Sequence, residues 1–260
     1  MKMKTMLAGC VVAAALVGCG GGGGGSSTTP VPVVVPSMEG YWLPAETSAT
    51  QALGVVTGTD AWFIGSDSTW FVRAHVTTST ANGSNSFVSV TDDSFHYALD
   101  PDGTTATGAA TTVSGTYIAK TSISGTLGAD VRTPETNPGT IALTYASAFE
   151  DAASLDSASG TWVGTYNNGE KELSLEISAS TVTTGTSTTG CSYAGTLSPH
   201  TSDAVFDFSV TETCVGGAET QMSGIAFLMS GAQPNNVFVF AATGDTDKTK
   251  GALFVGVRQQ

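Results

Sequence analysis

The stretch "CSYAGTLSPHTSDAVFDFSVTETC", Cys191 to Cys214, consists of two strand-like runs around a polar turn. Alternating aromatic, aliphatic and hydroxyl residues favour extended backbone, whereas Ser, Pro, His and Asp favour the turn. With the tip around residues 200–203, Tyr193 lies opposite Glu212 and Cys191 lies opposite Cys214. Opposed Cα atoms in an antiparallel pair lie ~4.5–5.5 Å apart, and a disulfide accepts ~4.4–6.8 Å. The stretch therefore predicts a hairpin closed by a Cys191–Cys214 disulfide.

The remainder of the last hundred residues has the same character. Short strand-like runs alternate with turn residues, at a spacing typical of an antiparallel barrel or sandwich. In order, the runs are "GTWVGTY", "KELSLEIS", "TVTTGTST", "GCSYAGTL", "AVFDFSVTETC", "QMSGIAFLMS", "NVFVFAA" and "GALFVGVR". The sequence thus predicts an eight-stranded barrel or sandwich over residues 160–260.

Two of these runs indicate how they are buried. Leu173, Leu175 and Ile177 share one face of their run, as the two-residue period of a half-buried strand requires. The run "NVFVFAA" at residues 236–242 has no polar face. We expect it to be covered on both sides, where two halves of the protein pack.

Residues 39–150 also read as strands, so the fold class is all-β and antiparallel, with two β-rich halves. A small polar linker, "DAASLDSAS" at residues 151–159, separates the halves, and "EGYW" at Glu39 and "SGTW" at Ser159 open them in a similar way. The clearest runs in the N-terminal β domain are "AWFIG", "TWFVRAHVT", "SFVSVT", "SFHYAL", "SGTYIAKTSISGTLG" and "TIALTYA".

The N-terminus has the features of a secretory signal peptide over residues 1–18. Lys2 and Lys4 precede a short apolar stretch, which is too short for a transmembrane helix. The sequence Leu-Val-Gly-Cys ending at Cys19 resembles the lipobox of bacterial lipoproteins. The resemblance implies that Cys19 is lipidated, with palmitate as an acyl group, and becomes the first residue. A second match at Cys10 leaves too short an apolar region before it.

Residues 19–38 are rich in glycine and proline and form the expected tether. A phosphate-binding loop would need the pattern G-x-x-x-x-G-K-[ST], which is absent. Among lipoproteins of this kind an aspartate after the cysteine often implies inner-membrane retention; Gly20 stands here, which implies the outer membrane. The tether resembles the start of surface-displayed β-barrel lipoproteins, such as transferrin-binding lipoproteins, but their G-x-F-x-G-P-like segment is absent.

The charge balance excludes several partners. Without Lys2 and Lys4, 7 of the 9 basic residues remain against 22 acidic ones, a net charge of −15. Such a surface repels nucleic acid and anionic lipid head groups. We therefore expect no nucleic-acid partner, and contact with the membrane through the N-terminal lipid.

The sequence predicts no catalytic residue, no metal site and no cofactor. His75 and His96 each alternate with the apolar residues of their runs, so both are expected to point away from the apolar side; His200 lies at the hairpin tip. No G-x-S-x-G or S-x-x-K motif is present. The aspartate pairs in "DPDGTTATG" at Asp100 and "GDTDKTKG" at Gly244 favour turns over calcium sites.

Three functions remain open. The first is a non-enzymatic lipoprotein that binds a protein or glycan partner or acts as a spacer. The second is a lipocalin-like carrier of a small apolar ligand, since an eight-stranded barrel can hold one ligand or be filled by side chains. The third is an envelope hydrolase. Six aromatic residues could line a pocket but are expected to pack in cores: Tyr41, Trp42, Trp62, Trp70, Trp162 and Tyr166.

Overall fold

The computed structural model describes residues 34–46, 51–99, 106–128, 139–167, 172–178, 182–200, 203–217, 219–229 and 236–259. The expected signal peptide, Cys10, Cys19, most of the tether and the Asp100 turn lie outside these residues. Residues from Val34 onward form one compact unit.

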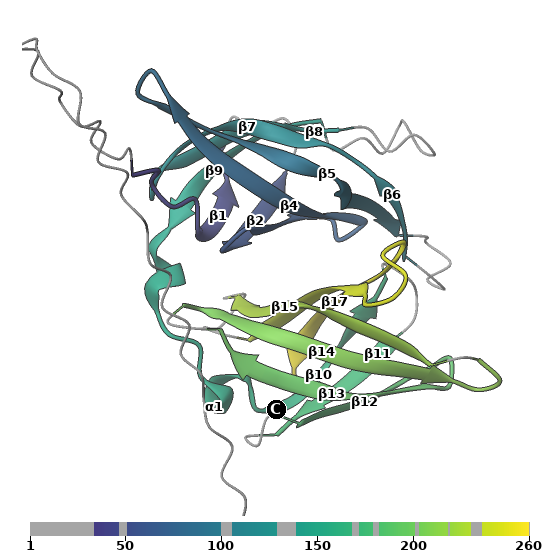
Figure 1. Cartoon of the computed structure of the whole chain (residues 1–260). Helices are drawn as coiled ribbons and strands as arrows, with labels where there is room; N and C mark the ends of the chain where they lie inside the picture. The colour runs from purple at the N-terminus through teal and green to yellow at the C-terminus, as the bar shows by residue number, and fades with distance from the viewer. Residues whose placement is uncertain are drawn as a thin grey trace, which may run out of the picture. The chain divides into compact units, whose positions relative to one another are not determined.

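The second half is a closed antiparallel barrel of eight strands (Figure 1). The barrel is one of the two architectures that the sequence predicts. Each strand pairs with the next, and the ring closes where the last strand pairs with the first, with Trp162 opposite Arg258. Its strands are β10 (Gly160–Tyr166), β11 (Glu172–Ile177), β12 (Val182–Ser187), β13 (Cys191–Pro199), β14 (Val205–Cys214), β15 (Thr220–Met229), β16 (Val237–Gly244) and β17 (Lys250–Arg258).

The hairpin of β13 and β14 has the predicted register. Tyr193 lies opposite Glu212, and Cys191 lies opposite Cys214. The two cysteines form a disulfide, with their Cα atoms 4.0 Å apart.

The first half also closes into a ring of eight strands. Its strand pairs run β1–β2–β3–β4–β5–β7–β8–β9 and return to β1. A short strand, β6, lies beside the end of β5. The strands are β1 (Gly40–Pro44), β2 (Ala52–Thr57), β3 (Asp60–Gly65), β4 (Trp70–Ala81), β5 (Ser84–Leu99), β6 (Ala106–Ala110), β7 (Val113–Ile118), β8 (Ser122–Leu127) and β9 (Gly139–Ala146).

The two rings are joined by a short connector with a 3-10 turn, η2 (Ser147–Glu150), and one helical turn, α1 (Leu155–Ala158). Each ring begins with Gly-x-Trp, and both indoles, of Trp42 and Trp162, are fully buried. The Trp162 indole donates to the carbonyl of Ala158 in α1, and the guanidinium of Arg258 lies 4.4 Å from its ring.

Side chains occupy the interior of each ring. In the second barrel, Phe208, Phe240 and Phe254 form a stack with centroid separations of 4.3 and 5.4 Å. Leu173, Leu175 and Ile177 belong to the same core, as their alternation predicted. The first barrel encloses a separate core that contains Trp42, Phe63, Trp70, Val72, Phe87 and Tyr117. Met38, which we assigned to the tether, packs in this core as well.

A third core lies between the barrels. It confirms that "NVFVFAA" is covered on both sides: Phe238 and Phe240 point into the second barrel, whereas Val239 and Ala241 point toward the first. This inter-barrel core contains Leu53, Val55, Trp62, Ile64, Phe71, Tyr97, Leu99, Ala106, Phe149, Val205, Ile225, Phe227, Val239, Ala241 and Leu253.

Backbone pairing also joins the barrels. Strand β6 pairs with β5 on one side and with β17 on the other, where Gly251 lies opposite Ala106. Tyr97 lies at this junction. Its ring stacks on Phe71 at 4.4 Å, and its hydroxyl donates to the carbonyl of Lys248, 2.5 Å away.

The expectation for His96 was wrong. Its side chain is fully buried inside the first barrel, where it lies opposite Val72 and contacts Trp70. By the alternation rule, the apolar residues Phe95, Tyr97 and Leu99 would form the inner face of their strand. They face the second barrel instead, so both faces of β5 are covered here. The runs "SFVSVT" and "SFHYAL" are one strand, interrupted by a bulge around Val90–Asp93.

Candidate functional sites

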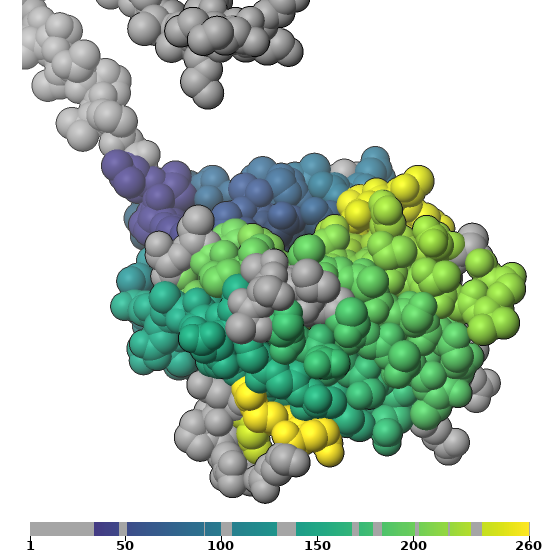
Figure 2. Space-filling model, turned by 90° about the horizontal axis from the view of Figure 1, so that it is seen from below, coloured from purple at the N-terminus to yellow at the C-terminus, as the bar shows by residue number. Residues whose placement is uncertain are grey.

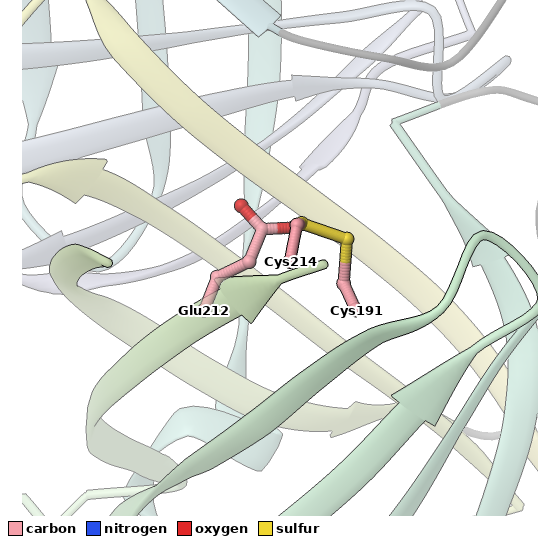
Figure 3. A group of neighbouring side chains, drawn as sticks. All are labelled: Cys191, Glu212 and Cys214. Carbon is pink, nitrogen blue, oxygen red and sulfur yellow. A yellow bond between two sulfur atoms is a disulfide. The ribbon is translucent and has the colours of Figure 1, made fainter. Parts of the chain in front are cut away.

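The disulfide lies beside a carboxylate at one end of the second barrel (Figure 3). Ligand atoms of Cys191, Cys214 and Glu212 lie within 4.8 Å of one another, a spacing that could suit a metal ion. In the oxidised chain the two sulfurs are bonded to each other, and cysteine binds a metal ion well only as a free thiolate. The Glu212 carboxylate instead accepts a hydrogen bond from the Tyr193 hydroxyl at 2.7 Å. This group is therefore structural.

Burial sets the chemistry of the neighbouring tyrosines. It raises the pKa of Tyr193 and of Tyr166 above the ordinary value, and the negative charge of Glu212 raises both further. Both phenols stay protonated at neutral pH and act as hydrogen-bond donors. They close this end of the barrel core with uncharged groups.

The histidines lie apart from one another. His75 is half-exposed on the outer face of β4, as predicted, with Nδ1 3.6 Å from Asp60. Asp60 is also bound by Arg73, whose guanidinium reaches Asp93 at 2.5 Å. The β5 bulge brings Asp93 over Arg73, so these groups form an ion-pair network that ties β3, β4 and β5 together.

His200 lies at the hairpin tip, as predicted, with Nδ1 2.8 Å from the carboxylate of Asp207. Asp247 lies in a turn between β16 and β17, as the stretch "GDTDKTKG" predicts. Its carboxylate accepts hydrogen bonds from the backbone N–H and the hydroxyl of Thr249, and these bonds lower its pKa.

A cavity of about 360 Å³ lies between the two barrels, beside the connector. Figure 2 shows the molecule from below, with the blue strands of the first half above the green strands of the second half. The lining consists of Tyr41, Leu43, Ala146, Ala148, Phe149, Asp151, Ala152, Ala153, Ser157, Ala204, Val205, Phe206, Phe227, Leu228 and Met229. Strands β1, β9, β14 and β15 and the connector supply these residues, so neither half alone forms the cavity.

The cavity walls are fixed by packing and hydrogen bonds. Tyr41 packs against Phe227 with ring centroids 5.6 Å apart, and burial raises its pKa to about 12. The backbone N–H of Ala204 donates to the carbonyl of Phe149, which attaches the hairpin tip to the connector. The walls of the cavity are therefore held in place by contacts within the folded chain.

A second feature is an outer surface of the first barrel that carries hydroxyl groups in rows. The first row crosses β4, β5, β7, β8 and β9, and the second row crosses the same strands two residues further along each of them. The third row lies two residues beyond the second on β7, β8 and β9 and continues onto β1. We call this surface the hydroxyl face. Its rows are Thr77, Val88, Ser114, Thr126 and Thr140; Ser79, Ser86, Thr116, Ser124 and Ala142; and Ile118, Ser122, Thr144 and Leu43.

The hydroxyl face carries no ionisable side chain in any of these rows. It exposes apolar groups as well, since Val88 is 53% and Ile118 is 61% solvent-exposed. By contrast, the outer face of β11 in the second barrel presents Glu172 and Glu176. Leu43 belongs both to the hydroxyl face and to the cavity lining, so the two features adjoin.

The candidate aromatic residues divide among three places. Trp42, Trp70, Trp162 and Tyr166 pack inside the barrels, as expected, and Trp62 packs between them. Tyr41 alone lines the cavity. Sequence reasoning missed both the cavity and the hydroxyl face. The hydroxyl face could have been anticipated from the sequence, because the segments 76–90 and 113–118 contain no charged residue.

None of the helices within the described ranges has the length and apolar character needed to cross a bilayer. No protein-family model, no curated protein and no solved structure matches this chain.

Proposed function

We propose that the chain is a lipid-anchored, non-enzymatic lipoprotein of the outer membrane, periplasmic or surface-exposed, which binds a protein or glycan partner through the hydroxyl face. The observation that carries the proposal is the absence of charge from that face in a chain of net charge −13. A partner can cover such a surface without desolvating ions, which is the costly part of forming a polar interface.

The chemistry of the face fits an uncharged partner surface. Each Ser or Thr hydroxyl can both donate and accept a hydrogen bond. Strand spacing places neighbouring hydroxyls ~4.8 Å apart across the sheet. The exposed Val88 and Ile118 add apolar area that a partner would remove from water.

Anchoring would come from Cys19, on the lipobox resemblance. The Cys19→Ser variant of the full chain should move from the membrane pellet to the soluble fraction, because the acyl chains supply the membrane affinity. Fractionation of producing cells and labelling with a palmitate analogue measure this. Unchanged pelleting with no label in the native chain would contradict the proposal.

Partner binding is tested by placing a charge in the centre of the hydroxyl face. Thr116 lies between Ser86 and Ser124 and is exposed. Thr116→Lys should weaken partner capture at least tenfold, because an unpaired ammonium would be buried under the partner. The matched control is Thr184→Lys, at an exposed threonine of the second barrel, which should bind as the native chain does.

The measurement is capture from envelope extracts, with protease-treated extract as the arm that separates a glycan from a protein. Capture that is lost in Thr116→Lys and kept in Thr184→Lys supports the proposal. Equal capture by both variants contradicts the assigned face, and no capture by the native chain favours a spacer. A broad esterase and glycosidase screen of the native chain addresses the hydrolase hypothesis.

The carrier hypothesis gains one specific observation. Aromatic and aliphatic side chains occupy the two barrel interiors, whereas the cavity of about 360 Å³ lies between the barrels. A lipocalin-like function would therefore use the inter-barrel cavity rather than a barrel lumen.

A further inference from the structure

We infer that the inter-barrel cavity is a binding site for a small amphiphile of about a dozen non-hydrogen atoms, whose polar end carries no negative charge. The inference does not depend on the partner proposed for the hydroxyl face. It follows from the size, lining and charge of the cavity.

Size sets the apolar part. A volume of about 360 Å³ lies at the lower end of the range for small-molecule sites, ~300–1,000 Å³. One water-sized group occupies ~30 Å³, so the cavity accommodates about a dozen such groups. A ten-carbon chain with one polar group has this size.

The lining sets the chemistry. Phe206 and Phe227 line the cavity and are almost fully buried, and Tyr41 packs against Phe227. Leu43 and Met229 add aliphatic surface that retains some solvent exposure. Such walls bind through burial of apolar surface, and the flexible side chain of Met229 adapts to the shape of a ligand.

One charge sets the choice of polar end. Among the described residues of the lining, Asp151 is the only ionisable acid or base apart from the phenol of Tyr41, and its side chain is exposed to solvent. The cations near the lining are already engaged, since Lys120 is paired with Glu150 at 2.8 Å and the guanidinium of Arg258 donates a hydrogen bond to the carbonyl of Ser157. An amphiphile inserted with its polar end outward would place that end near the Asp151 carboxylate. An ammonium or a hydroxyl is accepted there, whereas a fatty-acid carboxylate is repelled.

The test uses three probes of equal length: decylamine, 1-decanol and decanoate. Isothermal titration with the full chain carrying Cys19→Ser avoids acyl chains and detergent. The amine should bind with a Kd on the order of 100 µM, as ligands of this size do. Decanoate should bind about tenfold more weakly than the amine, with the alcohol between them.

Two variants locate the site. Asp151→Lys should reverse the order, so that decanoate binds more tightly than decylamine. Glu176→Lys makes the same charge change on the exposed outer face of β11 and should leave the order unchanged, which separates the Asp151 charge from the general field of the acidic protein. Met229→Trp should abolish binding of all three probes by filling the cavity.

Reversal in Asp151→Lys alone supports the inference. The inference would be overturned if no probe bound at concentrations up to the solubility limit of 1-decanol. It would also be overturned if Asp151→Lys bound the probes in the same order of affinity as the native chain, or if Glu176→Lys reversed that order as well. Because Asp151 is exposed, its substitution should not disturb folding, so the result stands even where Met229→Trp fails to fold.

Discussion

Replacement of Tyr97 with alanine should lower the free energy of unfolding by about 4 kcal/mol, in the range for removing a large aromatic side chain from a core. Tyr97 is fully buried, stacks on Phe71 and donates a hydrogen bond to Lys248 of the second barrel. Alanine therefore removes both packing and a polar link between the barrels. Denaturant titration followed by circular dichroism measures the change.

Two further substitutions separate these contributions. Tyr97→Phe keeps the stack and should cost only about 1–2 kcal/mol, because one hydrogen bond is lost and one acceptor is left unpaired. Gly251→Ala should lower the free energy of unfolding by about 1–3 kcal/mol, the range for overpacking a core. An added Cβ would lie 2.5 Å from the ring of Tyr97 and 2.8 Å from that of Phe71, and both rings are fully buried. A loss below about 1 kcal/mol in both Tyr97→Ala and Gly251→Ala would contradict a packed inter-barrel junction.

Removal of the disulfide should have the next largest effect. The Cys191→Ala, Cys214→Ala double variant should lose about 3 kcal/mol, because the bond closes a loop with a sequence separation of 23 and restricts the unfolded chain. The folded hairpin keeps its pairing, since the register from Cys191 to Pro199 is maintained by backbone hydrogen bonds.

Reduction of the native chain should reproduce this loss of stability, measured by thermal unfolding with and without reductant. The double variant itself should not respond to reductant. A native chain that is equally stable in both conditions would show that the bond contributes nothing to stability.

The second barrel was predictable because its hairpins are local and its alternation is clean. Each strand pairs with its neighbour in sequence, so turn positions and the two-residue period fix the register. The pairing of Tyr193 with Glu212 follows from the turn position alone. Closure into a barrel rather than a sandwich depends on the pairing of β17 with β10, which no local pattern specifies.

The first half was harder to predict because a second barrel covers part of its outer surface. The alternation rule assigns the apolar face of a strand to the interior, but in β5 the face that carries Ser94 and His96 is buried as well as the apolar face. Phe95 and Tyr97 are part of, or pack against, the inter-barrel core, whereas His96 points into the first barrel. The alternation rule therefore predicts that His96, which lies between two aromatic residues in the sequence, faces solvent, although it is buried.

The candidate sites could not be predicted for a related reason. The cavity is formed by β1, the end of β9, the connector, β14 and β15. Several of these elements are distant in sequence, and the volume of the cavity depends on how the two barrels pack. The hydroxyl face depends on register across β4, β5, β7, β8 and β9. Threonine and serine are abundant throughout the chain, so their alignment into rows becomes visible only in the sheet.

The most direct test of this account is whether the two barrels unfold together, because the shared β6–β17 pairing and the inter-barrel core make them one cooperative unit. Hydrogen exchange of the native chain at increasing denaturant, read by mass spectrometry on peptides from β4 and from β14, gives an opening free energy for each barrel. We predict equal opening free energies for the two peptides, lowered in parallel by Tyr97→Ala. Opening of one barrel at a clearly lower denaturant concentration, while the other stays protected, would contradict the account.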